Sequence, residues 1–86
     1  MTSFEKTPFQ VLRGSSDATI RFGDLRTLLE GLGFAERIKG SHHIFTREGV
    51  NEILNLQAKG SKAKAYQVKQ VRNVILRYRL ASHGDE

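Results

Sequence analysis

The sequence predicts a small α+β domain in which a helix, three antiparallel strands and a second helix follow one another. Two observations predict this order. Apolar side chains recur at helical spacing near both ends of residues 22–78, and three short strand-like segments lie between these stretches, bounded by turn-forming glycines. A chain of 86 residues has room for one domain. We expect both helices to pack on one face of the sheet, which leaves the opposite face open.

Each helix is predicted from apolar residues spaced three and four apart, which gather on one side of a helix. The first helix covers residues 22–33, and its stripe comprises Phe22, Leu25, Leu28, Leu29 and Leu32. Gly33 is well placed as its left-handed C-terminal cap, after which Phe34 is expected to fold back onto the helix. The second helix covers residues 65–78, and its stripe comprises Val68, Val71, Val74, Ile75 and Tyr78.

The three strands are predicted over residues 35–39, 42–46 and 52–57. Gly40-Ser41 makes the first tight connection, and residues 46–51 make the second. Apolar bulk in the third strand is expected from Ile53, Leu54 and Leu56. The basic segment that follows, residues 58–64, has nothing to bury, and we expect a loop that stays flexible or waits for a ligand.

The domain is expected to cover residues 21–80, between an N-terminal extension of residues 1–20 and a disordered tail of residues 81–86. No apolar run approaches the ~18 residues of a membrane span, and the N-terminus lacks the apolar centre of a secretory signal. The chain has no cysteine, which excludes a disulfide scaffold and a thiolate zinc site and fits the reducing cytoplasm. We therefore expect a cytoplasmic protein without a membrane partner.

Positive charge is concentrated toward the C-terminus. The formal net charge is +5. Residues 58–80 contain no acidic residue, and their basic residues are Lys59, Lys62, Lys64, Lys69, Arg72, Arg77 and Arg79. Such asymmetry is typical of proteins that bind a polyanion. A solvated face that keeps the protein soluble is the alternative, and we favour nucleic acid because no carboxylate interrupts the basic run.

Histidine is the side chain that naturally titrates near neutral pH, and two of the three histidines stand together in Lys39-Gly40-Ser41-His42-His43. Adjacent residues of a strand point to opposite faces, so only one of the two can face the open side of the sheet. Its position in the chain favours His42 as the candidate catalytic residue. His43 is the alternative, and would otherwise be a half-buried histidine with its polar atoms satisfied. Because these two side chains diverge and His83 lies in a polar tail, we predict no metal site. The sequence also contains no glycine-rich phosphate-binding loop, so we predict no cofactor.

A titratable imidazole on a small cationic domain suggests chemistry on, or binding of, a phosphodiester backbone. If that chemistry is the metal-free cleavage of RNA, it needs a base for the 2′-hydroxyl proton, an acid for the leaving 5′-oxygen and positive charge near the phosphorane. The candidate RNA-binding residues are Lys39, Gly40, Ser41, Lys59, Lys62, Lys64 and Arg72. Gly40 would let a phosphate approach the backbone, and Ser41 would hydrogen-bond it or orient His42, although both residues also suit a simple turn. Lys59, Lys62 and Lys64 would form a mobile clamp that contacts phosphates. Arg72 would reach the same groove from the second helix.

The order of elements resembles a double-stranded-RNA-binding fold. Residues 22–80 also resemble the HicA toxins, which are small ribonucleases of bacterial and archaeal toxin–antitoxin pairs. The resemblance rests on Gly33-Phe34, the cationic strand with Arg37 and Lys39, the run Gly40-Ser41-His42-His43-Ile44-Phe45 and the helix over residues 67–76. It implies a double-stranded-RNA-binding-like fold, metal-independent cleavage of mRNA, and neutralisation by a cognate HicB-like antitoxin. The catalytic histidine of the family directly follows the Gly-Ser pair, which corresponds to His42.

Two features depart from the family pattern. The N-terminal extension is additional, and Gln57-Ala58-Lys59 stands where many members carry a proline and a histidine after the third strand. The alternative function is a non-catalytic RNA-binding module with the same fold. A third interpretation, which we favour least, is a protein-interaction partner whose basic residues meet an acidic surface.

Overall fold

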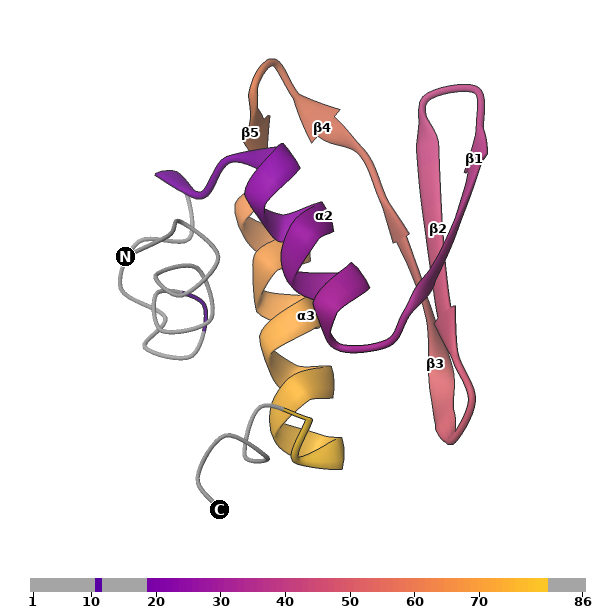
Figure 1. Cartoon of the computed structure of the whole chain (residues 1–86). Helices are drawn as coiled ribbons and strands as arrows, with labels where there is room; N and C mark the ends of the chain where they lie inside the picture. The colour runs from indigo at the N-terminus through magenta and orange to yellow at the C-terminus, as the bar shows by residue number, and fades with distance from the viewer. Residues whose placement is uncertain (1–10, 12–18, 81–86) are drawn as a thin grey trace.

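The computed structural model describes Val11 and residues 19–80, and it confirms the predicted order of helix, three antiparallel strands and helix (Figure 1). Its elements are α2 (Phe22–Gly31), β1 (Ala35–Lys39), β2 (His42–Arg47), β3 (Val50–Leu56), β4 (Ala58–Lys59), β5 (Lys62–Ala63) and α3 (Ala65–Tyr78). The predicted tail and most of the predicted N-terminal extension lie outside the described residues. No helix in the described part of the chain is long and apolar enough to cross a membrane.

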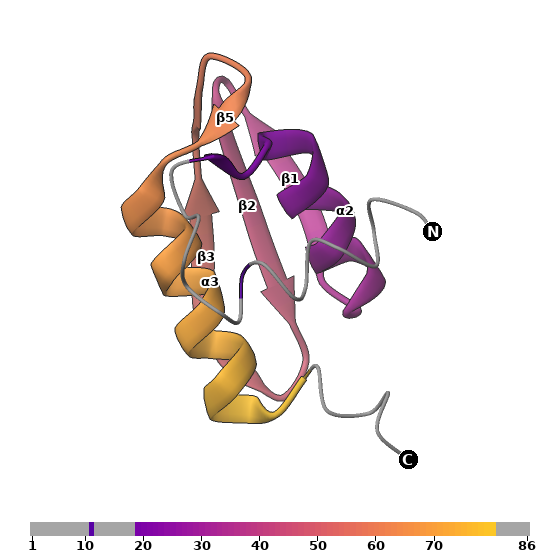
Figure 2. The same ribbon diagram turned by 90° about the vertical axis from the view of Figure 1, so that its left-hand side faces the viewer.

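The three long strands form an antiparallel sheet in the order β1-β2-β3. Lys39 pairs with His42 across the first hairpin, and Phe45 pairs with Leu54 across the second. Both helices lie on the same side of this sheet, as predicted (Figures 1 and 2). No described element covers the other side, which we call the open face.

The core lies between the helices and the covered side of the sheet. Each residue of the first predicted helical stripe is buried, and in the second stripe only Tyr78 is partly exposed. The sheet contributes alternate side chains, as the two-residue period of a strand requires: Phe45, Leu54 and Leu56. The periodicity of the apolar residues therefore predicted the core of both helices.

The third strand differs from its prediction in three ways, the first of which is that it ends at Leu56 and not at residue 57. It begins at Val50, two residues earlier than expected, because the turn at Glu48-Gly49 is tight enough for Val50 to pair with Arg47. Ile53 does not join the core: it remains 66% exposed on the open face, because its neighbour Leu54 takes the buried position.

The basic segment of residues 58–64 was wrongly expected to be a flexible loop. It forms the hairpin β4–β5, in which Lys59 pairs with Lys62. This hairpin is held against the start of α2, because the Phe22 N–H donates to the Ser61 carbonyl at 3.0 Å and the Ala63 N–H donates to the Ile20 carbonyl at 2.8 Å. The backbone pairing was not visible in the composition, because lysine side chains can stay in solvent while the backbone of the same residues is paired.

Two hairpins turn at a Gly-Ser pair. Gly40 links β1 to β2 with φ of +62°, and Gly60 links β4 to β5 with φ of +63°. A two-residue turn with positive φ at its first residue matches the right-handed twist of the strands it joins, and glycine adopts that conformation without steric cost. The two equivalent turns therefore set the register of the lysines and histidines beside them.

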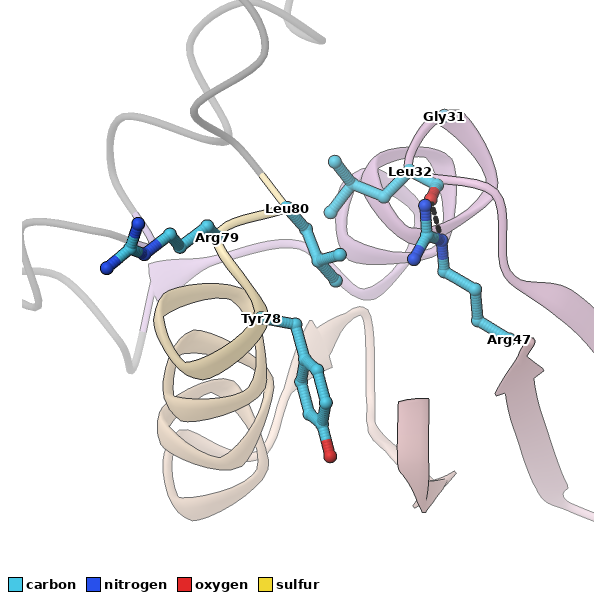
Figure 3. Close-up of a pocket in the computed structure, with 6 residues that line it drawn as sticks. All are labelled: Gly31, Leu32, Arg47, Tyr78, Arg79 and Leu80. Carbon is cyan, nitrogen blue, oxygen red and sulfur yellow. Dashed lines mark hydrogen bonds between the residues drawn. The ribbon is translucent and has the colours of Figure 1, made fainter. Parts of the chain in front are cut away.

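The C-terminal end of α2 is closed as the sequence predicts. Gly33 has φ of +94°, and the Gly33 and Phe34 N–H groups donate to the Glu30 and Leu29 carbonyls, each at 3.0 Å. This pattern is a Schellman motif. Arg47 supports it by donating its Nε to the Leu32 carbonyl at 2.8 Å, beside a hollow of about 350 Å³ at the C-terminal ends of both helices (Figure 3).

Candidate nucleic-acid interface

The open face carries positive charge and no carboxylate among the described strand residues that point to it. Directly paired residues of an antiparallel sheet share a face, and successive residues alternate. The side chains on the open face near the first hairpin are therefore Arg37, Lys39, His42, Ile44, Ile53 and Asn55. A surface of this composition favours an anionic partner over a cationic one.

His42 lies exposed at the first position of β2, on this open face. Its Nδ1 lies 3.0 Å from Oδ1 of Asn55 on β3. On the side of β1, His42 is paired directly with Lys39. Arg37, two residues before Lys39, is the next residue of β1 on the same face. The imidazole is thus placed between a neutral amide and a row of cations.

Side-chain contacts connect the turn before His42 to the basic segment of residues 58–64. Gln57 Nε2 donates to Ser41 Oγ at 2.7 Å, and Lys64 Nζ donates to Gln57 Oε1 at 3.3 Å. The Gln57 backbone N–H donates to Oε1 of the buried Gln67 at 3.0 Å, which ties this region to α3. The structure therefore brings Ser41 and Lys64 together, with Gln57 between them.

The three predicted clamp lysines occur at one end of the fold. Lys59, Lys62 and Lys64 line a hollow of about 300 Å³ beside the start of α3. Lys59 and Lys62 are directly opposite one another in the β4–β5 hairpin. Like charges in that arrangement repel, so an anion bound between them would relieve an unfavourable contact.

Arg72 is separate from the other predicted binding residues. Its Nη1 donates to the Val11 carbonyl at 3.3 Å. The α3 residues that contact β3, among them Gln67 and Tyr78, lie more than a quarter turn of the helix away from Arg72, given 3.6 residues per turn. The structure does not bring Arg72 to the open face.

His43 lies on the helix side of the sheet, opposite to His42, and the divergence of the two side chains is as strand alternation predicts. Its ring packs edge-on against Phe22 of α2, with centroids 4.9 Å apart, and its Nδ1 lies 2.7 Å from Glu36 Oε2. The side chain is only 17% exposed. His43 thus occupies the half-buried, hydrogen-bonded position described above for a structural histidine, and it does not share a face with His42.

Glu36 connects this histidine to α2. Arg26 donates two hydrogen bonds to the Glu36 carboxylate, Nε at 2.7 Å and Nη2 at 3.0 Å. The hydrogen bond from Arg26 lowers the pKa of Glu36, burial opposes this effect, and the contact with His43 lowers the pKa further. The cluster holds β1 and β2 against α2 on the side of the sheet opposite His42.

The lowered pKa of Glu36 predicts a loss of stability in acid. A carboxylate whose pKa is lower in the folded than in the unfolded state stabilises the fold above the unfolded value of about 4.3, and this contribution is lost as the pH falls through the folded value. Glu36→Gln is therefore expected to lower the free energy of unfolding by about 1 kcal/mol at pH 7. The difference between variant and intact chain should shrink as the pH falls from the unfolded value through the lowered folded pKa of Glu36.

Thermal unfolding between pH 7 and pH 3 measures this difference, with the exposed Glu48→Gln as a control that changes the net charge equally. A Glu36→Gln effect that persists unchanged at pH 3 would contradict a contribution from the charge.

Two residues of this interface were missed as site residues at the sequence level. Asn55 contacts His42, and Gln57 joins Ser41 to Lys64. The available signal is their alternation with the apolar Leu54 and Leu56, which marks them as facing away from the core. Their contacts depend on the register between β2 and β3, which the alternation does not give.

Comparisons of the chain with models of protein families, with curated proteins and with solved structures found no match.

Proposed function

We propose that this protein is a metal-independent endoribonuclease that cleaves mRNA, and that it is the toxin of a toxin–antitoxin pair. The observation that carries the proposal is the position of His42, an exposed imidazole on an open sheet face between Asn55 and Lys39. The resemblance of residues 22–80 to HicA toxins supports it further, as does the double-stranded-RNA-binding-like order of the elements.

The groups on the open face suit transesterification of RNA. The His42 imidazole takes the proton of a 2′-hydroxyl while the 2′-oxygen bonds to phosphorus and the bond from phosphorus to the 5′-oxygen breaks. The leaving 5′-oxygen takes a proton from water. The Lys39 ammonium, paired directly with His42, stabilises the additional negative charge of the phosphorane.

The basic hairpin supplies the grip on the rest of the RNA. Lys64 is linked to the turn before His42 through Gln57 and Ser41, so an RNA strand whose reacting phosphate lies at His42 can continue toward Lys59 and Lys62. Lysine contacts to phosphates give affinity without sequence preference. In the cytoplasm such an enzyme requires an inhibitor, and the resemblance identifies a cognate HicB-like antitoxin as that partner.

The test is incubation of the purified chain with a single-stranded RNA in the presence of EDTA. We expect fragments with 2′,3′-cyclic phosphate and 5′-hydroxyl ends, and we expect DNA of the same sequence to remain intact because it has no 2′-hydroxyl. RNA that is bound but not cut would instead establish the alternative, a non-catalytic RNA-binding module. One observation favours that alternative: His42 is the only histidine among the described residues on the open face near the first hairpin, so no second imidazole stands there to serve as the acid.

Replacing Lys59, Lys62 and Lys64 together by alanine is expected to weaken RNA binding and to flatten its salt dependence. Each phosphate contact to a single strand contributes about 0.7 to the slope of log affinity against log salt concentration, so the slope should fall by about 2. Fluorescence anisotropy with a labelled RNA between 50 and 300 mM salt, on a His42→Ala background to prevent cleavage, measures the slope.

The matched control removes three positive charges from α3 and its C-terminal end, namely Lys69, Arg77 and Arg79. If both triple variants lose the same slope, binding follows net charge alone and the hairpin is not the contact surface.

A further inference from the structure

We propose that Asn55 is a positioning residue that holds His42 in the tautomer protonated on Nδ1, so that Nε2 is the atom that accepts the 2′-hydroxyl proton. This inference rests on the proposed ribonuclease function. It adds a residue that the sequence did not indicate and a defined protonation state to the candidate site.

The contact joins two strands of the sheet. Asn55 on β3 is paired with Ile44 of β2, and His42 lies two positions from Ile44 on the same face. This diagonal arrangement is close enough for a ring nitrogen to meet a side-chain amide, and Nδ1 of His42 lies 3.0 Å from Oδ1 of Asn55. That distance is a hydrogen bond of ordinary length.

The backbone of Asn55 is anchored independently of its side chain. Gln67 of α3, 5% exposed, donates its Nε2 to the Asn55 carbonyl at 3.3 Å and accepts from the Gln57 N–H at 3.0 Å. A buried residue of the helix layer therefore holds the end of β3, which carries Asn55, and Gln57 directly after it. A site built on a strand fixed in this way positions a ring more firmly than a site on a loop.

The chemistry of the amide decides the tautomer. An amide oxygen only accepts hydrogen bonds, so the partner nitrogen of the neutral imidazole must donate. Nδ1 therefore carries the proton, and Nε2 keeps its lone pair. Because the amide is neutral, Asn55 orients the ring without adding a charge next to it.

The orientation matters for the direction of proton transfer. Nε2 is the ring nitrogen further from the backbone, and with Nδ1 occupied by Asn55 it is the nitrogen left for the substrate. In the reaction, Nε2 takes the 2′-hydroxyl proton as the bond from the 2′-oxygen to phosphorus forms and the bond to the 5′-oxygen breaks. The 5′-oxygen takes a proton from water, and the imidazolium later returns its proton to solvent.

The first experiment measures the tautomer without RNA. Long-range ¹H–¹⁵N correlation spectra at alkaline pH distinguish a protonated from an unprotonated ring nitrogen, and a His42→Ala spectrum assigns the His42 signals. We expect the intact chain to show Nδ1 of His42 protonated and Nε2 unprotonated. Asn55→Ala should shift the population toward the Nε2-protonated form, whereas Asn55→Asp, which keeps an acceptor oxygen, should not.

The control is Asn51→Ala, which removes the same side chain from the same strand at another exposed position. It should leave the His42 signals unchanged. An Nε2-protonated His42 in the intact chain, or spectra of Asn55→Ala equal to those of the intact chain, would overturn the role of Asn55.

The second experiment measures cleavage. Asn55→Ala is expected to lower kcat roughly 5- to 20-fold with KM little changed. This loss is smaller than the rate enhancement of about 10²–10⁴-fold that a positioned acid–base group supplies, because the variant keeps the His42 imidazole. Asn55→Asp should recover much of this loss and move the acidic limb of the pH–rate profile to higher pH, because a carboxylate stabilises the imidazolium. A purely structural role of Asn55 would lower kcat in Asn55→Ala without changing the tautomer population of His42.

The outcomes separate this inference from the proposed function. Cleavage that depends on His42 but is unaffected by Asn55→Ala overturns the positioning role alone. RNA that stays intact with the unmodified chain, or cleavage that survives His42→Ala, overturns the ribonuclease mechanism and with it any catalytic role of Asn55, whichever tautomer the spectra show.

Discussion

Substitution of His42 by alanine is expected to lower the rate of RNA cleavage by about 10²–10⁴-fold, because the variant lacks the acid–base group that accepts the 2′-hydroxyl proton. In a bacterial host the intact chain should arrest growth and deplete mRNA on induction, and His42→Ala should do neither. Affinity for RNA should change little, since the lysines of the β4–β5 hairpin remain in place. Growth curves, mRNA integrity and binding by fluorescence anisotropy measure the three effects.

The control for this substitution is His83→Ala, which removes another histidine and should leave growth arrest intact. His43→Ala is not a suitable control, because His43 packs against Phe22 and contacts Glu36, so its loss would weaken the fold. Equal toxicity of the intact chain and His42→Ala, at equal levels of folded protein, would exclude His42 as the catalytic residue.

Phe45→Ala is expected to destabilise the protein by about 3–5 kcal/mol, the usual cost of removing a large buried aromatic side chain. Phe45 is 1% exposed and pairs with Leu54 under the two helices. For a domain of this size the loss corresponds to a fall in Tm of at least about 12 °C. Thermal and urea unfolding followed by circular dichroism measure it.

The matched control is Ile53→Ala, also on the sheet but 66% exposed. It should cost less than about 1 kcal/mol, because its side chain stays largely in water in the folded protein. An equal loss for the two variants would contradict the assignment of Ile53 to the open face, and with it the placement of His42 on an uncovered surface.

The secondary structure followed from local signals in the sequence. The spacing of Leu25, Leu28 and Leu29 predicts the buried side of α2, and all three are buried. Gly33 predicts the end of the helix because only a residue without a side chain adopts its φ of +94° without strain. Strand alternation likewise predicted that His42 and His43 would face opposite sides. These features depend on residues close together in the chain.

The β4–β5 hairpin shows where local signals were insufficient. Its residues are lysines, glycine and small side chains, which predicted a loop. The hairpin is ordered by backbone hydrogen bonds to the segment before α2, such as that from the Ala63 N–H to the Ile20 carbonyl. Those partners lie some forty residues away in the sequence, so no local pattern of residues 58–64 indicates them.

The sequence by itself determined the order of the two helices and the three long strands, the buried stripes of both helices and the divergence of the two adjacent histidines to opposite faces of the sheet. Each depends on periodicity, which is a property of neighbouring residues. The tertiary structure alone decided that Asn55 meets His42, that Gln57 joins Ser41 to Lys64, and that Arg72 lies apart from them. These contacts depend on the register between strands and on the packing of α3 against β3, because both bring together side chains that are distant in the chain.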